Sequence, residues 1–120
     1  AEAGLGRIGR HALFISKDFG PAVRLATVLT DCPVCEERSF RQEDAGCGSC
    51  HACVSACPAG AISGREYALG MPREDFFDAK CCSEYMKKSF QMIGRGAVCG
   101  ICMSVCQKIW EEKFQKNLEK

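Results

Sequence analysis

The most informative segment of this chain reads Cys47-Gly48-Ser49-Cys50-His51-Ala52-Cys53-Val54-Ser55-Ala56-Cys57-Pro58. Its four cysteines follow the spacing C-x2-C-x2-C-x3-C-P, with which bacterial proteins hold [4Fe–4S] clusters. Three closely spaced thiolates can cap three irons of one cubane, whereas the fourth cysteine of the run serves another cluster in two-cluster proteins. The segment therefore predicts an iron–sulfur site whose fourth ligand comes from elsewhere in the chain.

A second group of cysteines follows, at Cys99, Cys102 and Cys106, preceded by the pair Cys81-Cys82. In a crossed arrangement, each run lends its last cysteine to the cluster of the other run. The first cluster is then predicted to have the ligands Cys47, Cys50, Cys53 and Cys106. The second is predicted to have Cys57, Cys99, Cys102 and one upstream cysteine. Gly96 stands three residues before Cys99 and cannot ligate, so this eighth ligand must come from Cys81 or Cys82.

Length and composition favour bound metal over disulfide bonds as the means of stabilising this chain. A chain of 120 residues buries one modest core, and small domains often need disulfides or metals. Disulfide frameworks close loops of many lengths, whereas the spacings here repeat as two, two and three residues. This regularity suits thiolates in a reducing compartment, so we expect a cytoplasmic location, with export of a longer parent protein left open.

The charge and hydropathy patterns exclude other classes. The formal net charge is +1, and the basic residues are interleaved with acidic ones, so no nucleic-acid partner is predicted. No apolar run approaches the roughly 20 residues of a membrane helix. The sequence begins at Ala1 rather than at a methionine, so we expect a fragment or a processed form of a longer protein.

The cysteine-free opening is expected to combine a short helix with a β-hairpin. Residues 7–13 follow glycines and are predicted to be helical. Residues 12–16 and 23–30 are rich in β-formers and flank a turn-forming cluster at 17–21. Because two strands alone are marginally stable in water, this hairpin should join a larger sheet in an upstream domain or a partner.

The cysteine-rich part is expected to consist of short helices and loops, giving an α+β fold class. Helical turns are predicted at 50–56, at 79–92 and from residue 99 onward, with a short extended segment at 59–62. The final helix places on one face the apolar residues Ile109, Trp110, Phe114 and Leu118. We expect this face to cover the cluster domain rather than to dock a partner.

Two other metal chemistries fit parts of the pattern. Cys47-Gly48-Ser49-Cys50-His51 matches C-x-x-C-H, the attachment signature of c-type haem. A haem would leave Cys53 and Cys57 without a role. Thiolate quartets also bind Zn²⁺, but zinc sites seldom use three cysteines at two-residue spacing followed by Cys-Pro. Clusters therefore remain the preferred interpretation.

Three smaller features have ordinary interpretations. Cys32 and Cys35 form a C-x-x-C pair that we interpret as free thiols or an auxiliary metal site. The G-x-G-x-x-G motif at residues 4–9 has no acidic residue at the distance that a dinucleotide site requires. His11 and His51 are expected to be structural or exposed. No catalytic residues are predicted, and we do not expect the chain to be catalytic alone.

Three segments together resemble a known superfamily. They are residues 4–10 leading into 13–16, residues 19–25 leading into 28–31, and the pattern that ends Cys99-Gly100-Ile101-Cys102-Met103-Ser104-Val105-Cys106. The chain resembles the C-terminal part of corrinoid-dependent iron–sulfur reductases, the group that contains epoxyqueuosine reductase and the reductive dehalogenases. In that group a nitroreductase-like corrinoid-binding domain precedes a double [4Fe–4S] ferredoxin-like domain.

The resemblance implies a domain division and further site residues. Residues 1–45 would be the end of the corrinoid-binding domain plus a linker, and residues 46–120 the double [4Fe–4S] domain. The family pattern of an aspartate, a cysteine and a tyrosine corresponds to Asp78, Cys82 and Tyr85, and so selects Cys82 as the eighth ligand. The glycines expected near the corrinoid, cobalamin in the full-length protein, are Gly4, Gly6 and Gly9.

The function that the resemblance implies is electron transfer through two [4Fe–4S] clusters to a corrinoid in a reductase. The electrons would come from a redox partner, a ferredoxin or a flavoprotein. Two alternatives remain open from the sequence. One is a stand-alone ferredoxin-like carrier or subunit without corrinoid, and the other is a zinc-stapled interaction module.

Overall fold

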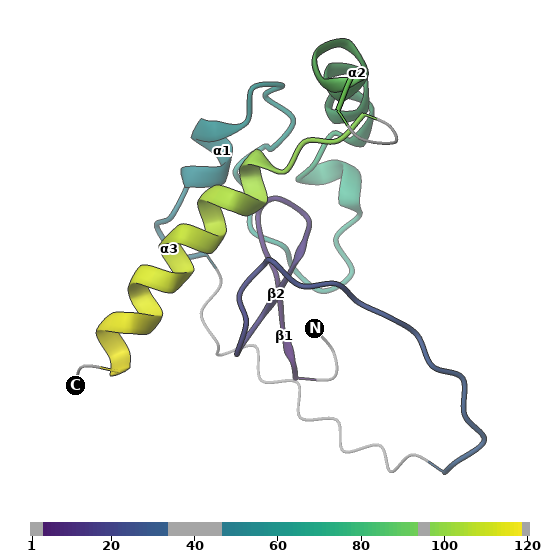
Figure 1. Cartoon of the computed structure of the whole chain (residues 1–120), viewed down its shortest axis with the longest axis vertical. Coiled ribbons are helices and arrows are strands. Elements are labelled where there is room, and N and C mark those ends of the chain that lie inside the picture. The colour runs from purple at the N-terminus through teal and green to yellow at the C-terminus, as the bar shows by residue number, and fades with distance from the viewer. Residues whose placement is uncertain (1–3, 34–46, 94–96, 119–120) are drawn as a thin grey trace.

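A computed structural model describes residues 4–33, 47–93 and 97–118, with side chains described as far as residue 113 (Figure 1). The elements follow the order β1, β2, α1, η1, α2 and α3, which agrees with the predicted α+β class. The prediction for Cys35 lies outside the described residues. Within the described part, no helix is both long enough and apolar enough to cross a membrane.

The opening of the chain is a β-hairpin rather than a helix. Strand β1 (Gly6–Ile8) pairs antiparallel with strand β2 (Phe14–Ser16), so that Arg7 faces Ile15 in the register. The expected helix at 7–13 is therefore wrong. Glycines at positions 6 and 9 disfavour a helix, and a Cβ at Gly6 would collide with the backbone oxygen of Ile15 and the ring of Phe14.

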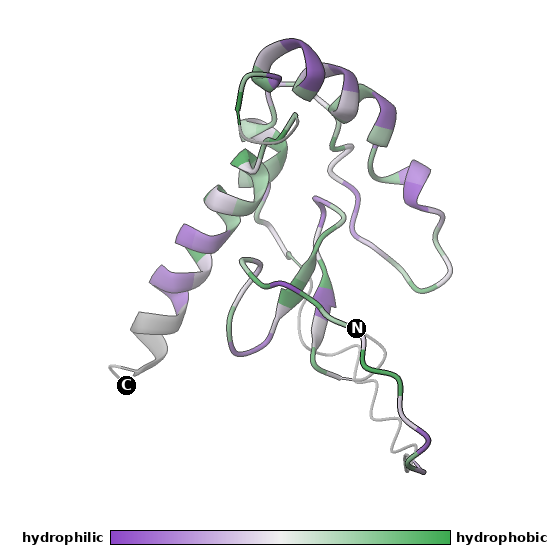
Figure 2. Ribbon diagram, turned by 45° about the vertical axis from the view of Figure 1, so that its right-hand side comes forward, coloured by the Kyte–Doolittle hydropathy of each residue, from purple (hydrophilic) through white to green (hydrophobic). Residues whose placement is uncertain are grey.

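The expected partner strand at 23–30 is also wrong. The turn at 17–20 forms as predicted and closes with hydrogen bonds between Ser16 and Gly20 in both directions, at 2.8 and 3.1 Å. Beyond it, residues 22–31 run extended with no strand partner among the described residues. Figure 2 shows hydrophobic residues along this segment, and Leu25, Val28 and Leu29 are 76%, 85% and 92% exposed. The β-formers are present, but the sheet edge they would join is not in the described structure.

Two helices of very different length pack against each other beside the hairpin (Figure 1). Helix α1 (Ala52–Ala56) ends before Cys57-Pro58, because a residue that precedes proline avoids helical dihedrals. Helix α3 (Ile101–Leu118) passes through the corresponding position, which is Gln107 after Cys106. The missing proline therefore allows the second run to continue as an 18-residue helix.

Gln107 also joins α3 to the hairpin loop. Its Oε1 accepts a hydrogen bond from the Ala22 backbone N–H at 3.1 Å, and its Nε2 donates to Glu111 at 2.9 Å. A Cβ on Gly20 would lie 2.9 Å from the ring of Trp110, so glycine permits this close approach. The described part of the expected apolar face, Ile109 and Trp110, is partly buried, whereas the side chains of Phe114 and Leu118 lie outside the described set.

The connection between the two cysteine runs ends in a capped helix. A short 3-10 turn, η1 (Arg73–Asp75), precedes helix α2 (Ala79–Phe90), and the Asp78 carboxylate caps α2 by accepting from the Cys81 N–H at 2.8 Å. The predicted extended segment at 59–62 forms a bridge from Ile62 to Phe77. The buried hydrophobic residues of the described part are few: Ile15, Cys53, Ala61, Ile62 and Phe76.

Candidate metal centre

Four thiols gather between the loop at 47–50, helix α1 and helix α3. The loop is held by a turn in which the Cys50 N–H donates to the Cys47 oxygen at 3.0 Å. Burial, together with smaller contributions from the neighbouring Cys47, Cys53 and Cys50, raises the pKa of Cys106 to about 11. Burial also raises the pKa of Cys53, with contributions from Cys47, Cys102 and Cys50. We call Cys47, Cys50, Cys53 and Cys106 the first quartet.

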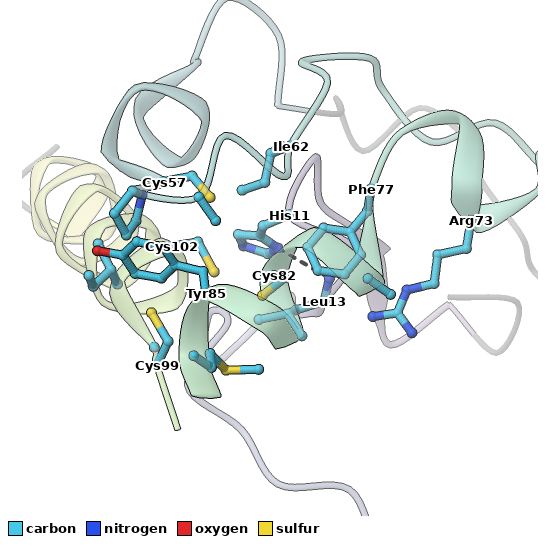
Figure 3. Close-up of a pocket in the computed structure, with 16 residues that line it drawn as sticks. His11, Leu13, Cys57, Ile62, Arg73, Phe77, Cys82, Tyr85, Cys99 and Cys102 are labelled. Atoms are coloured by element: carbon cyan, nitrogen blue, oxygen red, sulfur yellow. Dashed lines mark hydrogen bonds between the residues drawn. The ribbon is translucent and has the colours of Figure 1, made fainter. Parts of the chain in front are cut away.

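Four other thiols line one cavity of about 310 Å³ between α2, α3 and the loop after α1 (Figure 3). They are Cys57, Cys82, Cys99 and Cys102, which we call the second quartet. Burial raises the pKa of Cys82, and Cys57 and Cys99 contribute. Burial raises the pKa of Cys102 as well, with repulsion from Cys99, Cys57 and Cys82.

The two quartets have the crossed composition that the spacing predicts. Cys57 belongs to the first run of cysteines but lies in the second quartet. Cys106 belongs to the second run but lies in the first quartet. Cys102 of the second quartet contributes to the raised pKa of Cys53 in the first, so the two quartets are neighbours. Any metal group in one quartet would therefore lie near the group in the other.

Each quartet supplies the four thiolates that a [4Fe–4S] cluster takes. Among the described residues, no three Cys, His, Asp or Glu side chains form a group that could hold one metal ion. Zinc would need thiolates that converge to about 2.3 Å from one centre. A cubane instead binds each thiolate through a separate iron, which requires a wider quartet. The raised pKa values indicate that these crowded, buried cysteines need a bound cation to be held as thiolates, which either iron or zinc would supply.

Arg10 fixes the loop of the first quartet, and sequence reasoning missed it. This arginine is 7% exposed. Its Nε donates to the Cys50 oxygen at 3.1 Å, and its terminal nitrogens donate to the oxygens of Gly48 and Gly64. It also pairs with Glu66 at 3.2 Å, and Glu66 in turn accepts from the Gly48 N–H at 2.7 Å. Nothing in the sequence distinguishes Arg10 from a surface arginine.

The hairpin contributes two further polar groups near the thiols. His11, expected to be structural or exposed, is 2% exposed and lines the cavity of the second quartet. Arg7 lies close enough to Cys106 to lower the pKa of that thiol, against the larger effects that raise it. Within the described structure, His11 Nε2 and Arg7 Nε are buried without a hydrogen-bond partner.

The remaining cysteines lie outside the quartets. Cys82, and not Cys81, lines the cavity, while Cys81 Sγ donates to the Ala59 oxygen at 3.1 Å. Cys32 is exposed. All ten described cysteines are free, so no disulfide forms among them.

The haem-like motif lies in the first quartet, and the glycine-rich motif lies in the hairpin. Both cysteines of the haem-like motif belong to the first quartet, and His51 is exposed with its Nδ1 3.1 Å from the Ser49 oxygen. Gly6 lies in a strand and Gly9 in the hairpin turn, so no helix follows the glycine motif as a dinucleotide site would require.

Comparison with known proteins identifies the cysteine-rich part. Residues 46–108 match the family described as 4Fe-4S double cluster binding domain. Tetrachloroethene reductive dehalogenases from Desulfitobacterium hafniense and Dehalobacter restrictus are 31% identical to this chain over 119 residues, which cover 88% of this chain and 20% of those proteins. Epoxyqueuosine reductase from Lactococcus garvieae is 39% identical over 64 residues, covering 53% of this chain and 17% of that enzyme.

The chain thus spans about a fifth of the length of the dehalogenases that it matches. The search of solved structures gave no significant match. The resemblance predicted from the sequence is confirmed, because relatives from both predicted enzyme groups match. The chain belongs to the 4Fe-4S double cluster binding domain family, and its cofactors are two [4Fe–4S] clusters.

Proposed function

We propose that the first quartet ligates one [4Fe–4S] cluster and the second quartet ligates the other, and that electrons pass between them. The observation that carries this proposal is the pair of adjacent, crossed quartets. Each supplies the four thiolates that a cubane needs. Cys102 raises the pKa of Cys53 in the first quartet, so the two clusters would be close neighbours. Such a pair can accept an electron at one end and release it at the other.

We further propose that the electrons are destined for a corrinoid bound by residues upstream of this chain. In this proposal, residues 1–45 close the corrinoid-binding domain and residues 46–120 form the cluster domain. Two observations support it. Arg10 couples the hairpin directly to the cluster loop, and the exposed strand-like segment at 22–31 has the composition of a sheet strand. Of the matching relatives, one is named as a reductive dehalogenase and another as an epoxyqueuosine reductase.

The glycines at positions 4, 6 and 9 would then approach the corrinoid while serving the hairpin. Gly6 and Gly9 already have local roles, since side chains there would strike Phe14 and His11. The electron donor would be a ferredoxin or a flavoprotein, and the proposed compartment is the cytoplasm. A stand-alone ferredoxin-like carrier is the second candidate, supported by the compact pairing of both quartets within this chain.

Anaerobic reconstitution of the chain tests the cluster assignment. We expect about eight irons per chain and absorbance near 400 nm that bleaches on reduction, because each cubane holds four irons. The adjacent cysteines provide a matched pair. Cys82→Ser should lose at least half of the iron, whereas Cys81→Ser should keep it. Equal iron loss in both variants would contradict the assignment of Cys82.

Cobalamin binding separates the two candidate functions. The protein extended upstream through its preceding domain should bind cobalamin, and reduced clusters should then reduce the bound cobalt. Absence of binding by the extended protein, with both clusters intact, would favour the stand-alone carrier.

A further inference from the structure

His11 occupies a buried place between the hairpin and the second quartet. It lies in the turn after β1 and is 2% exposed. Gly9 makes room for it, since a Cβ there would lie 2.8 Å from the imidazole Cε1. Figure 3 shows the imidazole among the side chains of Cys57, Cys82 and Cys102, which line the same cavity. The function predicted from the sequence assigns no role to this histidine.

The hydrogen bonding of the ring fixes where its proton lies. The Leu13 backbone N–H donates to His11 Nδ1 at 3.2 Å, so Nδ1 is an acceptor. An Nδ1 that accepts a hydrogen bond carries no proton, so the ring is neutral. The single ring proton of neutral imidazole is then on Nε2. Nε2 is therefore a donor, and its lone pair is not available to bind iron.

This donor has no acceptor among the described residues. A buried, unpaired donor costs about 1–3 kcal/mol, so native structures rarely leave one without a partner. The other polar side chains of the cavity, Arg73 and Tyr85, do not bond to it. Sulfur atoms of a cluster held by the second quartet would offer acceptors in the same cavity.

We propose that His11 Nε2 donates a hydrogen bond to a sulfur of the cluster in the second quartet and thereby raises its reduction potential. The inference rests on the proposed function, in which that quartet holds a [4Fe–4S] cluster. Hydrogen bonds to cluster sulfurs are one of the means by which proteins set these potentials. The reduced cluster is more negative than the oxidised one, so a donor stabilises the reduced state more.

The potential of the reconstituted full chain tests this role. His11→Phe keeps a ring but removes the donor, and we expect one of the two midpoint potentials to become more negative. A tenfold change in the reduction equilibrium corresponds to about 59 mV for a one-electron couple. His11→Gln places an amide donor near the Nε2 position and should restore most of the shift. His51→Phe is the matched control, because His51 is exposed and lies in the loop of the first quartet.

Iron content separates failure of this inference from failure of the proposed function. If both midpoint potentials are unchanged in His11→Phe while about eight irons are retained, the role of His11 alone is overturned. If His11→Phe does not fold, pulsed EPR of the reduced wild-type protein with ¹⁵N-histidine gives the answer. A ¹⁵N coupling that persists in His51→Phe supports the hydrogen bond, and no histidine coupling in the wild type refutes it.

Discussion

A single guanidinium holds the loop that presents Cys47 and Cys50 of the first quartet. Arg10 donates to backbone oxygens at positions 48, 50 and 64 and pairs with Glu66. A lysine has the same charge but lacks the planar fork that reaches several oxygens at once. The position therefore requires the shape of arginine as well as its charge.

We predict that Arg10→Lys lowers the free energy of unfolding of the loaded protein by about 2–4 kcal/mol, since buried charged hydrogen bonds are lost. Iron should also leave the first quartet sooner under chelator challenge. Arg65→Lys is the control, because Arg65 is exposed and lies in the sequence between Gly64 and Glu66, which Arg10 contacts. Chemical denaturation and timed iron release measure both effects. Equal behaviour of the two variants would contradict the role given to Arg10.

At the scale of elements, the length of α3 depends on the residue after Cys106. Proline at the equivalent place in the first run ends α1 at Ala56, whereas Gln107 lets α3 continue and hold the loop at Ala22. The same cysteine spacing thus produces a short helix in one run and a long one in the other.

We predict that Gln107→Pro destabilises the protein by about 3 kcal/mol or more, because proline removes a helix hydrogen bond and clashes with the preceding turn. The expected signs are lower helicity by far-UV circular dichroism and a lower Tm. Gln107→Ala is the control, since it keeps the helix and loses only the side-chain hydrogen bonds to Ala22 and Glu111. A proline variant as stable as the alanine variant would show that α3 does not need to continue past Cys106.

The elements that sequence predicted well are those governed by local signals. The helical turns expected at 50–56 and 79–92 correspond to α1 and α2, where Pro58 stops α1 and Asp78 caps the start of α2. The hairpin was mispredicted because glycines at 6 and 9 matter through contacts with Phe14, Ile15 and His11, which no local pattern reveals.

The same limit applies to the candidate site. The spacing predicted seven of the eight thiols and left the eighth as Cys81 or Cys82, and the family resemblance selected Cys82. The structure brings the same eight together, although ligation itself stays a prediction. Arg10 and His11 escaped notice because their partners lie far along the chain, 40 residues away in the case of Cys50. A buried arginine or histidine has no periodic signature when the partner is a backbone oxygen or an inorganic sulfur.

At the scale of the whole molecule, the clusters must supply stability that the apolar core cannot. The buried hydrophobic residues of the described part are five, and one of them is Cys53. Small domains with so little core commonly fold only with their metal. Because each run of cysteines serves both quartets, loss of one cluster also loosens the ligands of the other.

We predict that iron chelation under anaerobic conditions removes both clusters in one cooperative step and unfolds the chain. Iron content, absorbance near 400 nm and near-UV circular dichroism should fall together. Cys57→Ser should weaken retention of both clusters, although Cys57 belongs to the second quartet. A stable, folded species with four irons after chelation would contradict this coupling.

The contact between Arg10 and the loop at 47–50 also limits how this protein can be divided. An engineer who grafts residues 46–120 onto another reductase would transplant every proposed sulfur ligand. The graft would nevertheless lack the guanidinium that braces the three carbonyl groups and neutralises Glu66. A transferable cassette has to start before the hairpin, at the glycines near the beginning of the chain.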